Sequence, residues 1–170
     1  MDERVFLAKI IIDGLYFIFF MKRYIAHIVV FMLMGFVISE LSEYFVVSLA
    51  GNSVADDNPI SQDSMKIKVL MGIIIGPLVE TFLFQHSVLN FTRNLFDEYP
   101  LSYVMPIFFS SLIFAIVHLF SIYYVIDAFI MGMWFAFSYL YILDKFESKM
   151  KAFMVPWITH LALNTIAILF

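Results

Sequence analysis

The stretch from Met71 to Asn90 reads MGIIIGPLVETFLFQHSVLN and is apolar over most of its length. About 20 apolar residues in succession are enough for a helix to cross the hydrocarbon core of a bilayer. Glu80 lies at the centre of this run, where a charged side chain costs about 2.5–3.5 kcal/mol on insertion scales. Because that cost must be compensated, we expect Glu80 to face a functional site, a water-filled cavity or polar groups on neighbouring helices.

The composition of the whole chain indicates a membrane protein. Of its 170 residues, 63% are hydrophobic and 14% are charged, and the mean hydropathy is +0.94, whereas soluble domains are about half apolar. We therefore expect a multi-pass protein of the cell membrane, with the lipid bilayer as its first partner. The net charge of −4 comes without a basic cluster, which indicates no nucleic-acid partner. The absence of cysteine excludes disulfides, thiolate nucleophiles and thiolate metal sites.

The apolar segments predict an all-α, polytopic membrane bundle of about six helices in a single domain, residues 1–170. The segments are Val5–Tyr24, Ile25–Leu49, Ile67–Phe91, Val104–Phe120, Tyr124–Leu143 and Ala152–Phe170. Lys9 and Asp13 interrupt the first, so residues 1–24 either span the membrane or lie in its interface. Polar connections are expected at Gly51–Ser64, at Thr92–Pro100 and at Asp144–Lys151, and the helices of residues 67–170 are expected to carry the site.

Few polar side chains interrupt the predicted spans. They are Glu80, Thr81, Gln85 and His86 on the third segment, His118 on the fourth, and His160 and Asn164 on the sixth. His160 and Asn164 are four residues apart and share a helix face. Counting about 1.5 Å per residue from the ends of the spans places Glu80, His118 and Asn164 at a similar depth, with His160 somewhat shallower. A carboxylate, two imidazoles and a carboxamide could thus meet in one layer.

Each of these residues also has a structural interpretation. A buried His can bond to a backbone carbonyl, Asn164 can link two helices by a hydrogen bond, and Thr81 can pack between helices. His86 also has a Phe four residues before it and an Asn four residues after it. Because it follows Glu80 by six residues, or about 240° of an α-helix, His86 is expected to point away from Glu80 and to have a structural or interfacial role.

The ordered set of a Glu motif, FxxxH and HxxxN on three membrane segments resembles the CPBP family, which comprises CAAX proteases and bacteriocin-processing enzymes and is also called the type II CAAX prenyl endopeptidase or Abi family. The matching stretches are ETFLFQ from Glu80 to Gln85, FAIVH from Phe114 to His118, and HLALN from His160 to Asn164. The family's first motif is usually EExxxR. This chain has Thr81 in place of the second Glu and Gln85 in place of the Arg, a paired change that conserves local charge.

The resemblance implies intramembrane proteolysis of a peptide or membrane-protein substrate. In that interpretation Glu80 and His118 activate a water molecule, His160 and Asn164 stabilise the oxyanion, and Thr81, Gln85 and Phe114 support the site. Donors aimed at a developing oxyanion contribute about 3–4 kcal/mol each. The family favours a mechanism without a cofactor, although Glu80, His118 and His160 could together hold a zinc ion with an open fourth position.

Two other functions fit the same segments. The altered first motif is compatible with a catalytically silent immunity or binding protein on the same scaffold. A small transporter or proton relay could also use Glu80 and the two histidines, but the chain contains no repeated pattern of broken helices. The sequence favours the endopeptidase and does not identify its substrate.

Overall fold

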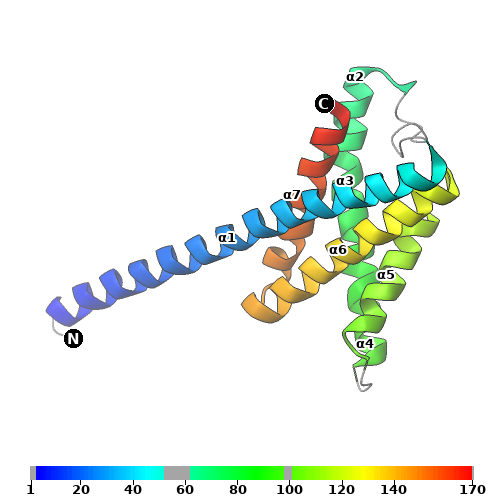
Figure 1. Ribbon diagram of the computed structural model, residues 1–170. Coiled ribbons are helices and arrows are strands. Elements are labelled where there is room, and N and C mark those ends of the chain that lie inside the picture. The colour runs from blue at the N-terminus through cyan, green and yellow to red at the C-terminus, as the bar shows by residue number, and fades with distance from the viewer. Residues whose placement is uncertain (1–2, 52–61, 98–100, 170) are drawn as a thin grey trace.

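A computed structural model of the chain describes residues 3–51, 62–97 and 101–169, and these residues are helical apart from short turns, with no strand among them. They form five continuous helical rods (Figure 1). The rods are α1 (Glu3–Ala50), the rod Met65–Phe96, α5 (Val104–Ile116), α6 (Ile122–Phe146) and α7 (Lys149–Leu169). Four of them are long and apolar enough to cross a membrane, and α5 is shorter. The predicted all-α membrane bundle is confirmed.

The first two predicted segments are one helix. α1 runs through 48 residues without a break, because the Lys22–Arg23–Tyr24 junction contains neither Gly nor Pro and a polar side chain alone does not end a helix. At about 1.5 Å per residue the helix is about 72 Å long, more than twice the hydrocarbon thickness of about 30 Å. α1 therefore crosses the membrane obliquely or extends beyond its core. Of the predicted polar connections, residues 52–61 and 98–100 lie outside the described residues.

From about Phe20 onward α1 packs across α6 and α7, while the part before it extends away from the other helices (Figure 1). Hydrogen bonds at three points attach α1 to the bundle. The Tyr24 hydroxyl donates to the Lys151 carbonyl at 2.9 Å, the Trp134 indole N–H donates to the Phe31 carbonyl at 3.2 Å, and the Ser42 hydroxyl donates to Asp127 at 2.6 Å. These bonds hold α1 against the bundle at three levels along its length.

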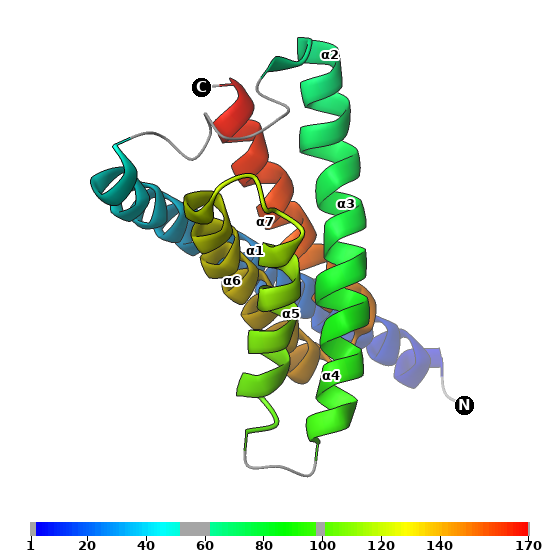
Figure 2. The same cartoon turned by 90° about the vertical axis from the view of Figure 1, so that its right-hand side faces the viewer.

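The rod Met65–Phe96 alternates between α-helical and wider π-helical turns. Its parts are α2 (Met65–Ile67), η3 (Lys68–Ile75), α3 (Gly76–Glu80), η4 (Thr81–Val88) and α4 (Leu89–Phe96). Pro77 at the start of α3 lacks an amide hydrogen and its ring disfavours the normal bond to the fourth residue before it. The preceding π-helical turn accommodates the break, since the Gly76 N–H bonds to Met71, five residues earlier. Figure 2 shows the rod running the full height of the bundle beside α5.

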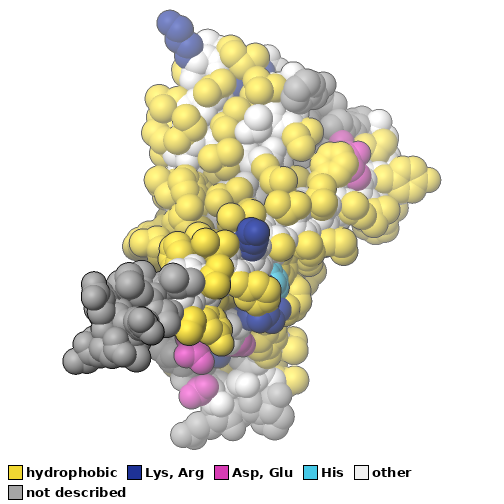
Figure 3. Space-filling view, turned by 90° about the vertical axis from the view of Figure 1, so that its left-hand side faces the viewer, with side chains coloured by type: hydrophobic (Ala, Val, Ile, Leu, Met, Phe, Trp, Pro, Cys, Tyr) yellow, Lys and Arg dark blue, Asp and Glu magenta, His cyan; other side chains and the backbone are white. Residues whose placement is uncertain are grey.

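Two clusters of buried side chains form the core. One joins α1, α4, α6 and α7 around Tyr139 and Leu140, and the other joins η4, α5, α6 and α7 around Phe114 and Phe135. The outer surface is mainly hydrophobic, with small groups of Lys and Arg on the face in Figure 3. Exposed apolar side chains such as Phe82 and Phe91 are therefore expected to contact lipid.

The close approach of α1 to α6 and α7 depends on Gly35. A Cβ atom at this position would lie 2.9 Å from both the Thr159 methyl carbon and the Trp134 indole nitrogen. We predict that Gly35→Val separates α1 from the bundle and lowers the thermal unfolding midpoint, measured by differential scanning fluorimetry in detergent. Gly14→Val is the control, because a Cβ at Gly14 has no heavy atom within 4 Å. Equal midpoints for the two variants would contradict this description of the α1 packing.

Candidate active site

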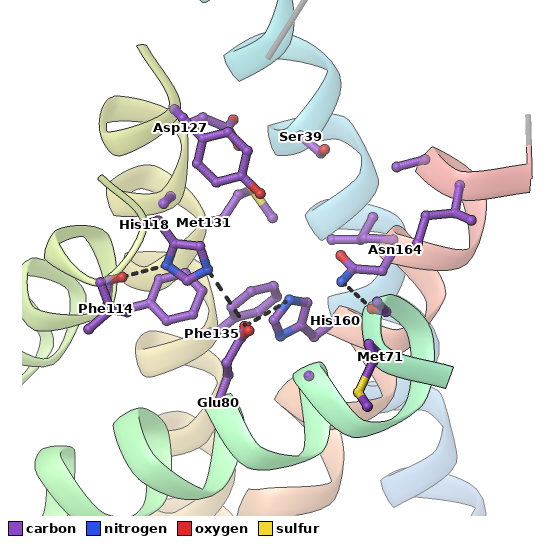
Figure 4. A pocket seen from close by; sticks show the side chains of 18 of the residues that line it. Ser39, Met71, Glu80, Phe114, His118, Asp127, Met131, Phe135, His160 and Asn164 are labelled. Atoms are coloured by element: carbon purple, nitrogen blue, oxygen red, sulfur yellow. Dashed lines mark hydrogen bonds and ion pairs between the residues drawn. The ribbon is translucent and has the colours of Figure 1, made fainter. Parts of the chain in front are cut away.

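A cavity of about 670 Å³ lies between α1, η3, α3, α6, α7 and the turn that follows α5. It contains the four residues predicted to act in catalysis, Glu80, His118, His160 and Asn164. Figure 4 shows these side chains directed into the cavity from three separate parts of the fold. Glu80 and Asn164 are 84 residues apart in the sequence. The side chains of the predicted site therefore come together in one cavity of the bundle.

Glu80 lies between the two imidazoles. Its Oε1 is 3.9 Å from the His118 Nε2, and its Oε2 is 3.6 Å from the His160 Nε2. The Glu80 side chain keeps 28% of its surface exposed, against 14% for His118 and 9% for His160. Both separations exceed the length of a direct hydrogen bond, which is about 2.7–3.2 Å. A small molecule such as water could therefore bond to the carboxylate and to an imidazole at the same time.

His118 lies outside a helix, contrary to the prediction that the fourth span continues to Phe120. α5 ends at Ile116, and residues 117–120 form a turn. The His118 Nδ1 is 2.7 Å from the Phe114 carbonyl oxygen. Because a carbonyl only accepts hydrogen bonds, Nδ1 must carry the proton and donate it. In the neutral ring the Nε2 that faces Glu80 is then an acceptor.

His160 has the opposite arrangement of its ring nitrogens. Its Nδ1 is buried with no hydrogen-bond partner among the described residues, and its ring stacks on Phe135 with a centroid separation of 4.7 Å. The Nε2 faces the Glu80 carboxylate. A negative carboxylate favours a proton on the nearer nitrogen, so the neutral ring presents an N–H to the cavity.

Asn164 connects α7 to η3. One N–H of its amide donates to the Gly72 carbonyl oxygen at 2.7 Å, and the second N–H is not used in that bond. Gly76, on the same rod, allows a tight backbone, since a Cβ there would lie 2.6 Å from the Met71 carbonyl oxygen. The bond to Gly72 fixes the Asn164 carboxamide at the cavity wall.

His86, which matches both FxxxH and HxxxN, lies on a face of the rod Met65–Phe96 that is directed away from the cavity. The His86 Nδ1 is 2.9 Å from the Tyr139 hydroxyl, and the Asn90 amide donates to the same hydroxyl at 2.8 Å and to the His86 carbonyl. Neither His86 nor Asn90 lines the cavity. Their bonds with Tyr139 join the rod Met65–Phe96 to α6, which is a structural arrangement.

The three predicted supporting residues differ in position. Phe114 lines the cavity and packs on the His118 ring at 4.6 Å between centroids. Thr81 and Gln85 are fully buried and do not line the cavity. Their side chains therefore pack between helices behind the site and do not face the cavity.

Sequence reasoning missed two residues of α6 that line the cavity, Tyr124 and Asp127. Asp127 accepts the hydrogen bond from Ser42 of α1 at the cavity wall. The spacing of six residues from His118 to Tyr124 carried no signal, because the turn between α5 and α6 sets their relative positions.

The described residues contain no group of three or more His, Asp and Glu side chains arranged to hold a metal ion. Glu80, His118 and His160 come together around the carboxylate, with both nitrogens at 3.6–3.9 Å from its oxygens. Zinc bonds to nitrogen and oxygen are about 2.0–2.2 Å long. Two ligands of one tetrahedral zinc ion with such bonds lie about 3.3–3.6 Å apart. The separations here are close to that spacing, and the use of zinc stays a prediction for a chelation experiment.

The Asn164 bond to Gly72 gives a prediction about the site's rigidity. Asn164→Ala leaves the Gly72 carbonyl without this donor, and hydrogen bonds between membrane helices contribute about 0.6 kcal/mol on average and up to about 1.7. We expect faster hydrogen–deuterium exchange in Gly72–Gly76 and a slightly lower unfolding midpoint. Asn94→Ala, at an exposed position of α4, should change neither. Unchanged exchange in the Asn164 variant would show that this bond does not hold η3.

Comparison with known families adds independent information. Residues 63–166 match the family model described as type II CAAX prenyl endopeptidase Rce1-like. No curated protein and no solved structure matched the chain. The matched residues include Glu80, His118, His160 and Asn164, whereas α1 lies outside them. Because the match covers more than half of a chain whose helices can cross a membrane several times, the chain belongs to the Rce1-like family of type II CAAX prenyl endopeptidases, which are membrane proteases.

Proposed function

We propose that the chain is an intramembrane endopeptidase of the cell membrane in which Glu80 and His118 activate water, and His160 and Asn164 stabilise the oxyanion. The observation that carries this proposal is the placement of the Glu80 carboxylate between two imidazole Nε2 atoms, at 3.6 and 3.9 Å, inside a cavity of about 670 Å³. A carboxylate with two imidazoles can move protons in both directions during hydrolysis.

The geometry supports a water molecule shared by Glu80 and His118. The His118 Nε2 and the Glu80 Oε1 both accept hydrogen bonds, and a separation of 3.9 Å lets one water lie about 2.8 Å from each. That water would donate one hydrogen to each acceptor and direct its oxygen lone pair to the substrate. As the water oxygen bonds to the peptide carbonyl carbon, its proton passes to Glu80.

The remaining steps use the other two side chains. The carbonyl oxygen gains negative charge as the tetrahedral intermediate forms, and the His160 Nε2–H and the second Asn164 N–H are the donors available to it. The C–N bond then breaks, and the proton held by Glu80 passes to the departing amine, directly or through His118. The carboxylate is regenerated, so one water is consumed for each peptide bond.

The cavity walls support a peptide or membrane-protein substrate. Apolar side chains from several helices face the space beside Glu80, including Met71, Met131, Phe135 and Leu163. Burial of apolar substrate side chains against such walls contributes about 25 cal/mol per Å². This lining fits a substrate segment that enters from the membrane, and it is compatible with both a lipid-modified and an unmodified peptide.

The test is cleavage of a peptide library by the purified protein in lipid nanodiscs. Glu80→Gln removes the general base and should lower turnover by about 10²–10⁴-fold, and His160→Ala should lower it by about 10²–10³-fold through loss of an oxyanion donor. Glu40→Gln at an exposed position of α1 and His27→Ala, outside the cavity, are matched controls that should retain wild-type rates.

A chelator arm separates the two possible mechanisms. Cleavage that persists in the presence of chelator supports the glutamate mechanism, whereas loss of cleavage that returns with added zinc supports a metal held by Glu80, His118 and His160. A folded wild-type protein that cleaves no member of a broad library would favour the immunity or binding function. Ion flux through liposomes that changes with Glu80→Gln would favour a transporter.

A further inference from the structure

His118 is an unusual catalytic candidate because its backbone is not held by a helix. It lies in the turn 117–120 between α5 and α6, where its N–H donates to the Ala115 carbonyl at 3.0 Å and its carbonyl accepts from Phe120 at 2.8 Å. These bonds fix the backbone of His118 but do not set the rotation of its side chain. The direction of its Nε2 toward Glu80 must therefore be fixed by contacts of the ring.

Two aromatic rings restrain the imidazole. The Tyr124 ring stacks almost parallel to it, with centroids 5.8 Å apart and an interplanar angle of 13°. The Phe114 ring packs at 4.6 Å with a tilt of 50°. The bond from Nδ1 to the Phe114 carbonyl fixes one atom of the ring but allows rotation about that contact. The Tyr124 face limits this rotation because a turned imidazole would lose the stack.

Tyr124 is itself held firmly. It belongs to the first turn of α6, where its N–H donates to the hydroxyl of the N-cap residue Ser121 at 3.1 Å. Asp127, one turn further along α6, accepts the hydrogen bond from Ser42 of α1 at 2.6 Å. The Phe120 ring also packs perpendicular to the Tyr124 ring, with centroids 5.1 Å apart. The start of α6 is thus fixed by its own cap and by α1.

We propose that Tyr124 is a positioning residue: its ring, anchored at the start of α6, holds the His118 imidazole in the plane that directs Nε2 toward Glu80. The aromatic face performs this role and the hydroxyl is not required for it. The effect on catalysis rests on the hydrolytic function proposed above, whereas the effect on the orientation of His118 does not. The two parts can therefore be measured separately.

The first experiment observes the ring directly. In protein labelled with ¹³C-histidine, the His118 signal is assigned by its loss in His118→Gln, since the chain has four histidines. Tyr124→Leu should change the NOE contacts between the His118 ring protons and the Phe114 ring, which report the plane of the imidazole independently of the ring current of the removed phenol, and Tyr124→Phe should keep contacts close to those of the wild type. Tyr123→Leu, at a neighbouring residue that does not line the cavity, is the control and should leave them unchanged.

The second experiment measures turnover of a peptide that the wild-type protein cleaves. Tyr124→Leu should lower kcat by about tenfold or more, as misplacement of a reacting group does, with a smaller change in KM, and Tyr124→Phe should recover most of kcat. NOE contacts of the His118 ring that stay unchanged in Tyr124→Leu would overturn the proposal even if no substrate is found. Changed contacts with an unchanged kcat would limit Tyr124 to a structural role and would also overturn it.

Discussion

The fold must accommodate a carboxylate within a hydrocarbon environment. Glu80 lies in the middle of a rod that is otherwise apolar, and an isolated charge there would be costly. The structure compensates this cost with two imidazoles, at 3.6 and 3.9 Å from the carboxylate oxygens, and with a cavity that leaves part of the side chain exposed. Since those imidazoles come from α7 and from the α5–α6 turn, tolerance of Glu80 depends on the packing of the whole bundle.

Residues on a regular helix could be predicted well from spacing. His160 and Asn164 are four residues apart on α7, and both line the cavity as their shared face requires. The α-helical rule also placed His86 away from Glu80, and in the structure His86 bonds to Tyr139 on a different face. The residues between them are π-helical, however, so the angle that the rule assumes does not hold there. The long apolar runs likewise identified the membrane helices. These predictions need only the geometry of one helix at a time.

Features that depend on several helices could not be predicted in this way. The sequence-based prediction places a break between two segments at the charged Lys22–Arg23 junction, although this junction contains neither Gly nor Pro. That the second half of this one helix lines the cavity depends on its packing and could not be read from the sequence. The end of α5 at Ile116 was also missed, because the apolar residues continue to Phe120. Consequently the turn that carries His118, and the contact of this turn with Tyr124, were not visible before the helices were placed in space.

The burial of Thr81 and Gln85 explains why uncharged residues can stand at these two positions of the first motif. The family pattern that the chain resembles has a second Glu and an Arg where Thr81 and Gln85 stand, and here both side chains are fully buried behind the site. A buried ion pair often gains little over an uncharged replacement, because desolvation of two charges offsets their attraction. Removing both charges together leaves no unpaired ion, but the Thr81 hydroxyl and the Gln85 amide are buried without a hydrogen-bond partner among the described residues. In the proposed mechanism, proton transfer rests on Glu80 and His118, and His160 with Asn164 stabilises the oxyanion. The change at Thr81 and Gln85 leaves these four residues in place.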